Sequence, residues 1–118
     1  MAIYPCDISS HRYPQPQQSI YWTLVHGELL VTYKQRLCPS HFRVQATECQ
    51  TSMALVDDNS QVSATCELCH SDREGALYAK VFPNKSEMQQ FALDLCEVHL
   101  QELADKLRIR SGRRLESP

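Results

Sequence analysis

The chain has 118 residues, of which 42% are hydrophobic and 22% are charged, and a formal net charge of −2. This length allows one compact domain or two very small ones, and the composition excludes a disordered or collagen-like class. A membrane-spanning class is excluded because no apolar run approaches about 20 residues. The first residues show no charged segment followed by an apolar one, so we expect no signal peptide and an intracellular, by default cytoplasmic, protein.

The first part of the chain is predicted to form a β-hairpin followed by a helix. Two runs rich in aromatic and β-branched residues, 19–25 and 29–37, flank a short break that contains Gly27. Pro39 suits the first turn of a helix, because its missing N–H is not needed there. One apolar stripe of that helix comprises Phe42, Ala46, Cys49 and Met53.

The second part of the chain repeats this order after a loop-favouring segment at 54–64. Residues 75–82 are predicted to form a strand, 83–86 a turn and 87–96 a returning strand. A helix is predicted from Glu97, where leucine and alanine recur at helical spacing. The predicted fold class is therefore small α+β.

The pattern Leu-Cys-x-x-His occurs at 37–41 and again at 95–99. Cys38 follows Cys6 by 32 residues and Cys96 follows Cys66 by 30 residues, which predicts an internal repeat with a period near 60. The predicted organisation is a first unit at 1–53, a linker at 54–64, a second unit at 65–110 and a basic polar tail at 111–118.

The second unit carries four candidate zinc ligands. Cys66 and Cys69 form a Cys-x2-Cys pair, which lets two thiolates from one tight turn reach the same ion. Cys96 and His99 lie three residues apart at a predicted helix start and so project from one face. Because six cysteines in a reducing compartment are more often ligands or buried thiols than disulfides, the set predicts tetrahedral Zn²⁺.

The first unit carries a divergent copy of this set. Ser9, a poor zinc ligand, stands where the second cysteine of the Cys-x2-Cys pair is expected, and His11 two residues later is predicted to replace it. The predicted first site comprises Cys6, His11, Cys38 and His41. With both sites filled, we expect two zinc ions per chain. The alternative is a degenerate first repeat without metal, which would leave one ion as the minimum.

This arrangement resembles the treble-clef zinc finger, in which a cysteine knuckle and a hairpin are followed by a helix whose first turn supplies the second ligand pair. Here the resemblance occurs in tandem and covers nearly the whole chain. The resemblance implies that Cys66 and Cys69 form the knuckle of the second unit, with Cys96 and His99 as its helical pair. In the first unit it implies Cys6 as the knuckle cysteine and Cys38 and His41 as the helical pair. Ser9 and the absence of a knuckle glycine depart from the family pattern.

Several rival interpretations use the same residues. The stretch 66–70 also spells the Cys-x-x-Cys-His signature of c-type haem attachment, and Cys66 and Cys69 match a thioredoxin-like redox motif. Haem attachment would need export and leaves Cys96, His99 and the repeat unexplained, and the redox motif lacks its βαβ context. Cys49, on the apolar stripe of the first helix, is interpreted as a buried thiol rather than a ligand.

All four ligand positions are filled by the protein, which favours structural ions and a non-enzymatic role. The main hypothesis is a scaffold for protein–protein interaction or assembly, which would use the aromatic first hairpin. The alternative is nucleic-acid binding through the basic C-terminal residues. A remote alternative is a nuclease built on a treble clef, with His26 in the hairpin turn. No small-molecule substrate is predicted.

A protein partner is favoured over a nucleic acid because the sequence pI is near 6.2. The residues that would contact nucleic acid under the alternative are Lys106, Arg108, Arg110, Arg113 and Arg114.

Overall fold

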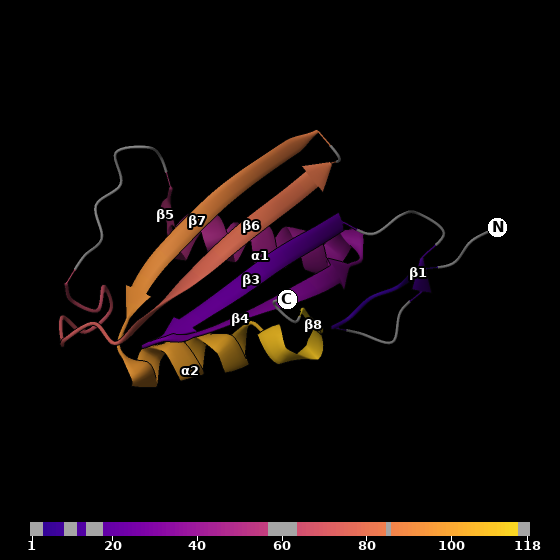
Figure 1. Cartoon of the computed structure of the whole chain (residues 1–118). Helices are drawn as coiled ribbons and strands as arrows, with labels where there is room; N and C mark the ends of the chain where they lie inside the picture. The colour runs from indigo at the N-terminus through magenta and orange to yellow at the C-terminus, as the bar shows by residue number, and fades with distance from the viewer. Residues whose placement is uncertain (1–3, 9–11, 14–17, 57–63, 85, 116–118) are drawn as a thin grey trace.

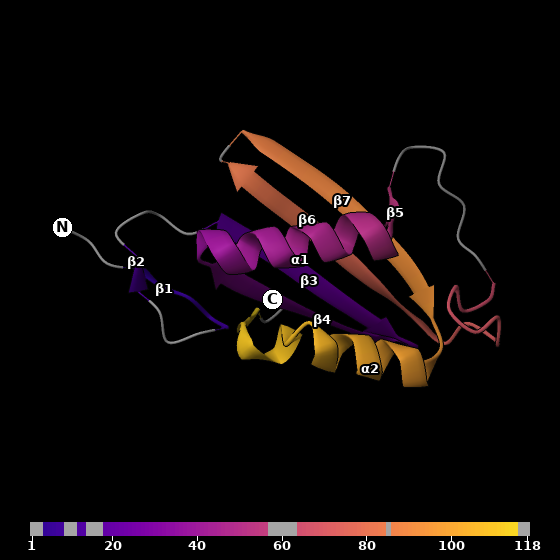
Figure 2. The same cartoon turned by 180° about the vertical axis from the view of Figure 1, so that it is seen from behind.

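A six-stranded antiparallel sheet with two helices on one face forms the body of the protein. The computed structural model describes residues 4–8, 12–13, 18–56, 64–84 and 86–115. Figures 1 and 2 show both helices packed on the same side of the sheet. Over the described ranges no helix covers the opposite side. The predicted α+β class is confirmed.

The first half forms the predicted hairpin and helix. Strands β3 (Gln18–His26) and β4 (Leu29–Leu37) pair from end to end around a tight turn in which Gly27 has a φ of +61°. Helix α1 (Pro39–Ser52) follows directly, with Pro39 in its first turn as predicted. Cys38 is the N-cap of this helix, and its thiol accepts a hydrogen bond from the His41 N–H.

The second half repeats this order with a shorter turn than predicted. Strand β6 (Gly75–Asn84) extends into the segment predicted as a turn, and β7 (Glu87–Leu95) returns beside it. Helix α2 (Glu97–Lys106) begins at the predicted residue and is followed by the 3-10 helix η1 (Ile109–Ser111). No described helix is long and apolar enough to cross a membrane.

The two hairpins are joined through their first strands. Strands β3 and β6 pair antiparallel at the centre of the sheet, whose order is β5-β7-β6-β3-β4-β8. Strand β5 (Ala54–Leu55) leaves α1 and pairs with β7, whereas β8 (Arg113–Leu115) follows α2 and pairs with β4. Each half therefore adds a strand to the edge of the other half's hairpin.

These two short strands lie in segments predicted as linker and tail. A strand of two or three residues has no alternation from which to predict it, and its pairing depends on an open edge supplied by distant residues. The N-terminal region forms a separate two-stranded ribbon, β1 (Tyr4–Pro5) with β2 (Arg12–Tyr13).

The core lies between the sheet and the two helices. Ile20 and Trp22 on β3 are fully buried, and the strand register places Val81 and Ala79 of β6 beside them on the same face. The two helices complete this core with a set of buried residues from both halves. These are Phe42, Gln45 and Cys49 of α1 and Leu100 and Ala104 of α2.

A buried polar network links the first half to the end of α2. The Trp22 indole N–H donates to the Gln35 side-chain oxygen at 2.7 Å. The Gln35 amide donates to the Arg108 carbonyl at 2.7 Å, and the Gln45 amide donates to the Leu107 carbonyl, also at 2.7 Å. In the described part of the chain, every buried side-chain N or O atom has a hydrogen-bond partner.

Gly75 allows the two halves to approach closely where β6 begins. A Cβ at this position would lie 2.2 Å from the Val25 carbonyl oxygen and 2.9 Å from Leu100 Cδ2. We expect Gly75→Ala to lower the free energy of unfolding by about 1–3 kcal/mol, because the overlap with backbone requires strands to move. Urea denaturation measures this. Ala54→Ser, on an exposed edge strand, is the control, and an equal loss in both variants would contradict the steric argument.

Candidate metal centres

The structure brings together the four predicted ligands of the second half. The ligand atoms of Cys66, Cys69, Cys96 and His99, here named centre 2, all lie within 4.8 Å of one another. The Cys69 and Cys96 sulfurs are 3.8 Å apart, and His99 Nδ1 lies 3.6 Å from Cys66 Sγ and 3.1 Å from Cys96 Sγ.

These distances suit one tetrahedral zinc ion. With Zn–S bonds of about 2.3 Å and Zn–N bonds of about 2.0 Å, tetrahedral geometry separates two sulfurs by about 3.8 Å and a sulfur from a nitrogen by about 3.5 Å. Two of the three distances agree closely, and the Cys96–His99 distance is slightly shorter. The donor set, three thiols and one imidazole, also matches the preference of zinc for sulfur and nitrogen.

Backbone hydrogen bonds fold the knuckle of centre 2. The His70 N–H donates to the Cys66 carbonyl at 2.9 Å, which closes a tight turn, and His70 takes the left-handed conformation with a φ of +63°. A histidine thus occupies a left-handed backbone conformation, which glycine adopts most readily. The Glu67 carboxylate accepts a hydrogen bond from the Asp94 N–H at 2.7 Å, which fixes the knuckle beside β7.

The surroundings of centre 2 favour thiolates. Burial of the Cys66 thiol opposes ionisation, but hydrogen bonds from the backbone of Cys96, Leu68 and Cys69 outweigh it and lower the pKa of Cys66. The hydrogen bond from the His99 backbone N–H is the main cause of the lowered pKa of Cys96. Lowered thiol pKa values help metal binding, because the thiolate is the ligand.

Three predicted ligands of the first half form a matching cluster, here named centre 1. Cys6 Sγ lies 3.6 Å from His41 Nδ1, and Cys38 Sγ lies 3.1 Å from the same nitrogen. Both distances equal those of the corresponding atoms in centre 2. In each centre a helix N-cap cysteine and a histidine three residues later meet a distant cysteine. His11, the predicted fourth ligand, lies outside the described residues.

The two centres lie at opposite ends of the sheet (Figure 1). Centre 1 follows the end of β4 and centre 2 follows the end of β7, and these strands enter their helices from opposite directions. Each centre thus joins one sheet end to one helix N-terminus.

Cys49 belongs to neither cluster. It is buried on the sheet side of α1, and desolvation, with a smaller contribution from Glu48, raises its pKa to about 12. A thiol held protonated in this way is a poor metal ligand, in agreement with its interpretation as a core residue.

The five basic residues predicted as a nucleic-acid surface lie in two segments, the end of α2 with η1 and the strand β8. Lys106 lies 2.7 Å from Glu48, and Arg110 lies 3.7 Å from Asp105. Arg113 and Arg114 belong to β8, at the sheet edge beside Lys34 and Tyr33.

A third group, not predicted from the sequence as a cluster, comprises His26, Glu74 and Glu97. His26 Nε2 lies 4.0 Å from a Glu97 carboxylate oxygen. Glu74 accepts a hydrogen bond from the Glu97 N–H at 3.1 Å and so caps α2. The pairing of β3 with β6 brings these residues together, and no local motif in the sequence indicates it. Both carboxylates are exposed, and helix capping accounts for Glu74.

Comparison with protein-family models, with curated proteins and with solved structures found no match to this chain.

Proposed function

We propose that the protein is a zinc-stabilised, non-enzymatic scaffold that presents a binding surface to a macromolecular partner. One zinc ion would occupy centre 2, held by two knuckle cysteines, the N-cap cysteine of α2 and the histidine in its first turn. A second ion would occupy centre 1. The observation that carries this proposal is the convergence of four Cys and His ligand atoms within 4.8 Å in centre 2.

A structural role fits centre 2 better than a catalytic one. Four protein ligands complete a tetrahedral shell, whereas a catalytic zinc keeps one position open for water or substrate. Each ion would tie the end of a hairpin to the start of a helix and to a segment distant in sequence. Structural zinc contributes roughly 10–16 kcal/mol of apparent binding free energy in finger peptides, enough to hold such short elements together.

The equal ligand distances in the two centres support a tandem, treble-clef-like origin of the halves. In both, a distant cysteine precedes a hairpin and a helix N-cap pair follows it. We propose an internal repeat in which the first knuckle has diverged at Ser9 and His11 supplies the fourth ligand.

Three aromatic residues of the first hairpin do not form one partner surface. They are Tyr21, Trp22 and Tyr33. This aromatic hairpin, the near-neutral charge and the closed metal sites together favoured a protein partner. Trp22 is fully buried and donates to Gln35, so it stabilises the core instead of anchoring a partner. Tyr33 packs partly against the same core. Of these three aromatic residues, only Tyr21 therefore lies on the sheet face without helices.

The zinc content of untagged protein tests the proposal. We expect elemental mass spectrometry to find two zinc ions per chain, falling to one in His11→Ala. His70→Ala is the matched control, because this exposed histidine lies beside the knuckle but outside the cluster, and it should retain both ions. One ion in both the wild type and His11→Ala would leave centre 1 without metal. No zinc at all would overturn the scaffold proposal.

A further inference from the structure

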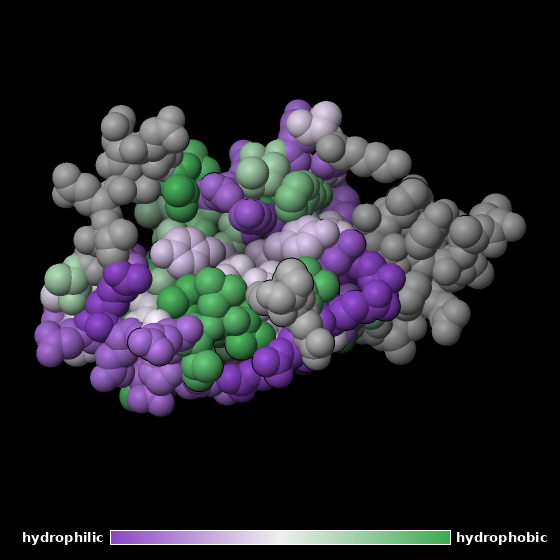
Figure 3. Space-filling view, viewed as in Figure 1, coloured by the Kyte–Doolittle hydropathy of each residue, from purple (hydrophilic) through white to green (hydrophobic). Residues whose placement is uncertain are grey.

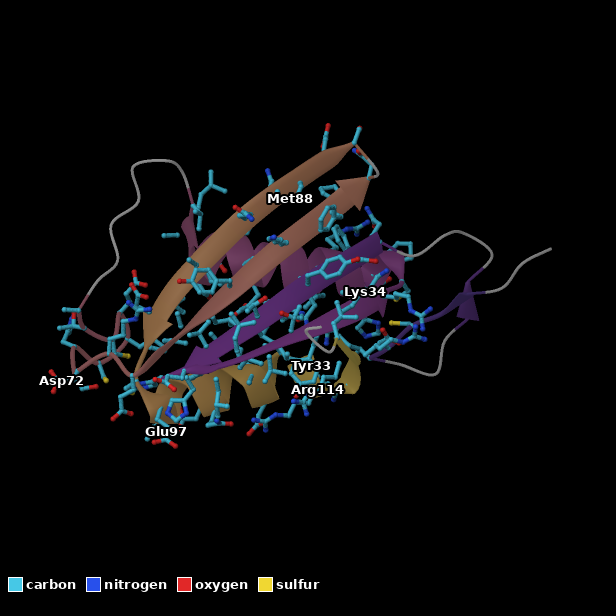
Figure 4. The ribbon with its side chains drawn as sticks, in the orientation of Figure 1. Tyr33, Lys34, Asp72, Met88, Glu97 and Arg114 are labelled. Carbon is cyan, nitrogen blue, oxygen red and sulfur yellow. The ribbon has the colours of Figure 1, made fainter. Side chains whose placement is uncertain are left out.

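The sheet face opposite the helices, here named the open face, is defined by strand alternation. Ile20 and Trp22 of β3 are buried toward the helices, so Tyr21 and Thr23 point to the other side. Tyr21 pairs with Lys34 of β4 and with Lys80 of β6, which places both lysines on the same face. Figure 3 views this side, and Figure 4 labels Lys34 upon it.

A row of three cations crosses the open face around one tyrosine. The register runs from Arg113 on β8 to Lys34 on β4, Tyr21 on β3 and Lys80 on β6. Neighbouring strands are about 4.8 Å apart, so Arg113 and Lys34 stand directly opposite each other as like charges. Such a pair destabilises a sheet, and its presence is explained if an anion lies over the row.

The described residues supply little negative charge here. In the described part of the chain, no carboxylate lies within ion-pair distance of Lys34, Lys80 or Arg113. Asp94 of β7, the acidic strand residue on this face, is held at 3.1 Å by Arg73. The open face is therefore locally basic although the whole chain has a net charge of −2.

Aromatic rings flank the cation row. The rings of Tyr21 and Phe82 meet edge to face, with centroids 5.3 Å apart, and the Lys34 ammonium lies 5.4 Å from the centre of the Tyr21 ring. Tyr78 pairs with Thr23 on the other side of the row. All three rings are only half-buried, so they offer stacking surface beside positive charge.

A groove of about 300 Å³ adjoins the row on the β7 side. Tyr78 and Val56 line it together with the Gln90 amide and Lys80. A planar base can stack on an aromatic ring while an amide hydrogen-bonds to its edge, which is a common mode of recognition for unpaired bases.

We propose that the open face binds single-stranded nucleic acid, with phosphates over Arg113, Lys34 and Lys80, and bases stacked on Tyr78, Tyr21 and Phe82. An open sheet face with half-buried rings suits unpaired bases, because bases inside a duplex cannot reach the rings. Figure 3 shows an apolar patch on this side of the molecule, and Leu29 and Leu30 beside the hairpin turn are exposed. This inference rests on the proposed scaffold, which holds the sheet together.

Fluorescence anisotropy with labelled oligothymidine of roughly 12 nucleotides tests the inference on zinc-loaded, full-length protein. We expect the triple variant Lys34→Gln/Lys80→Gln/Arg113→Gln to weaken binding at least tenfold. Between about 50 and 200 mM salt, the slope of log affinity against log salt should become shallower by about 2, since each single-strand phosphate contact contributes about 0.7. Tyr78→Leu should weaken binding about tenfold and leave the slope unchanged.

The matched control is Lys106→Gln/Arg108→Gln/Arg110→Gln, which removes the same charge from the end of α2 and should bind like the wild type. Equal loss in both triple variants, equal binding of duplex, or no binding at low salt would overturn the inference. Self-association of the wild type that the open-face triple variant abolishes would assign the face to a protein partner instead. The zinc content is measured on the same samples. Zinc-loaded protein that fails to bind the oligonucleotide overturns this inference alone, whereas folded protein that contains no zinc overturns the proposed zinc-stabilised scaffold.

Discussion

Replacing Cys96 by serine is expected to remove the zinc ion of centre 2 and to unfold both halves together. Cys96 is a predicted ligand and also the N-cap of α2, so the substitution removes a ligand through which the ion would link this helix to the knuckle. Structural zinc contributes roughly 10–16 kcal/mol, which is comparable to the whole stability of a small domain at about 5–15 kcal/mol. Because β6 pairs with β3 along nearly its whole length, the first hairpin loses its central neighbour when the second half unfolds.

Zinc content, circular dichroism and amide hydrogen exchange measure this outcome. Cys49→Ala is the matched control, because it removes a buried thiol that lies outside both clusters and should keep both ions. If the β3 and β4 amides of Cys96→Ser stay protected from hydrogen exchange, the first half folds independently. That result would contradict the expectation that both halves unfold together.

Local patterns were sufficient to predict the hairpins, the helices and the residues that meet in the metal clusters. Alternating and aromatic runs predicted β3, β4 and most of β6 and β7, because those strands each bury one face. The Cys-x-x-His pairs predicted the helix starts, where the N-cap geometry brings sulfur and nitrogen within 3.1 Å in both halves. The meeting of Cys6 with Cys38 and His41 also follows the predicted repeat spacing.

The contacts between the halves could not be predicted from local sequence. Nothing near Gly75 indicates that β6 pairs with β3, since both are central strands whose partners lie about 55 residues away along the chain. The sequence left open whether Trp22 packs in the core or contacts a partner, because its sequence neighbours do not reveal that Gln35 accepts its N–H. The basic row of the open face could not be predicted for the same reason, because its residues come from three separate strands.

Gln35→Leu is expected to lower the free energy of unfolding by about 1–3 kcal/mol without releasing zinc. Leucine is close to glutamine in size, so the loss comes from hydrogen bonds and not from a large cavity. The Trp22 N–H would lose its partner in the buried interior, where an unsatisfied group costs about 1–3 kcal/mol. The Arg108 carbonyl would lose the bond from Gln35 but keep those from the Ser111 N–H and hydroxyl. The Gln45 amide, which also lies 3.3 Å from the Gln35 oxygen, keeps its bond to the Leu107 carbonyl.

A double-mutant cycle with Trp22→Phe isolates the bond between Trp22 and Gln35. Trp22→Phe removes the indole N–H, so Gln35→Leu should cost about 1 kcal/mol less in that background than in the wild type. Gln90→Leu, a change of the same chemistry on the open face, should alter stability by under about 0.5 kcal/mol. If urea denaturation gives Gln35→Leu the same small effect as Gln90→Leu, the network does not hold the first hairpin to the end of α2. The paired strands and the metal centres would then have to hold the two halves together without it.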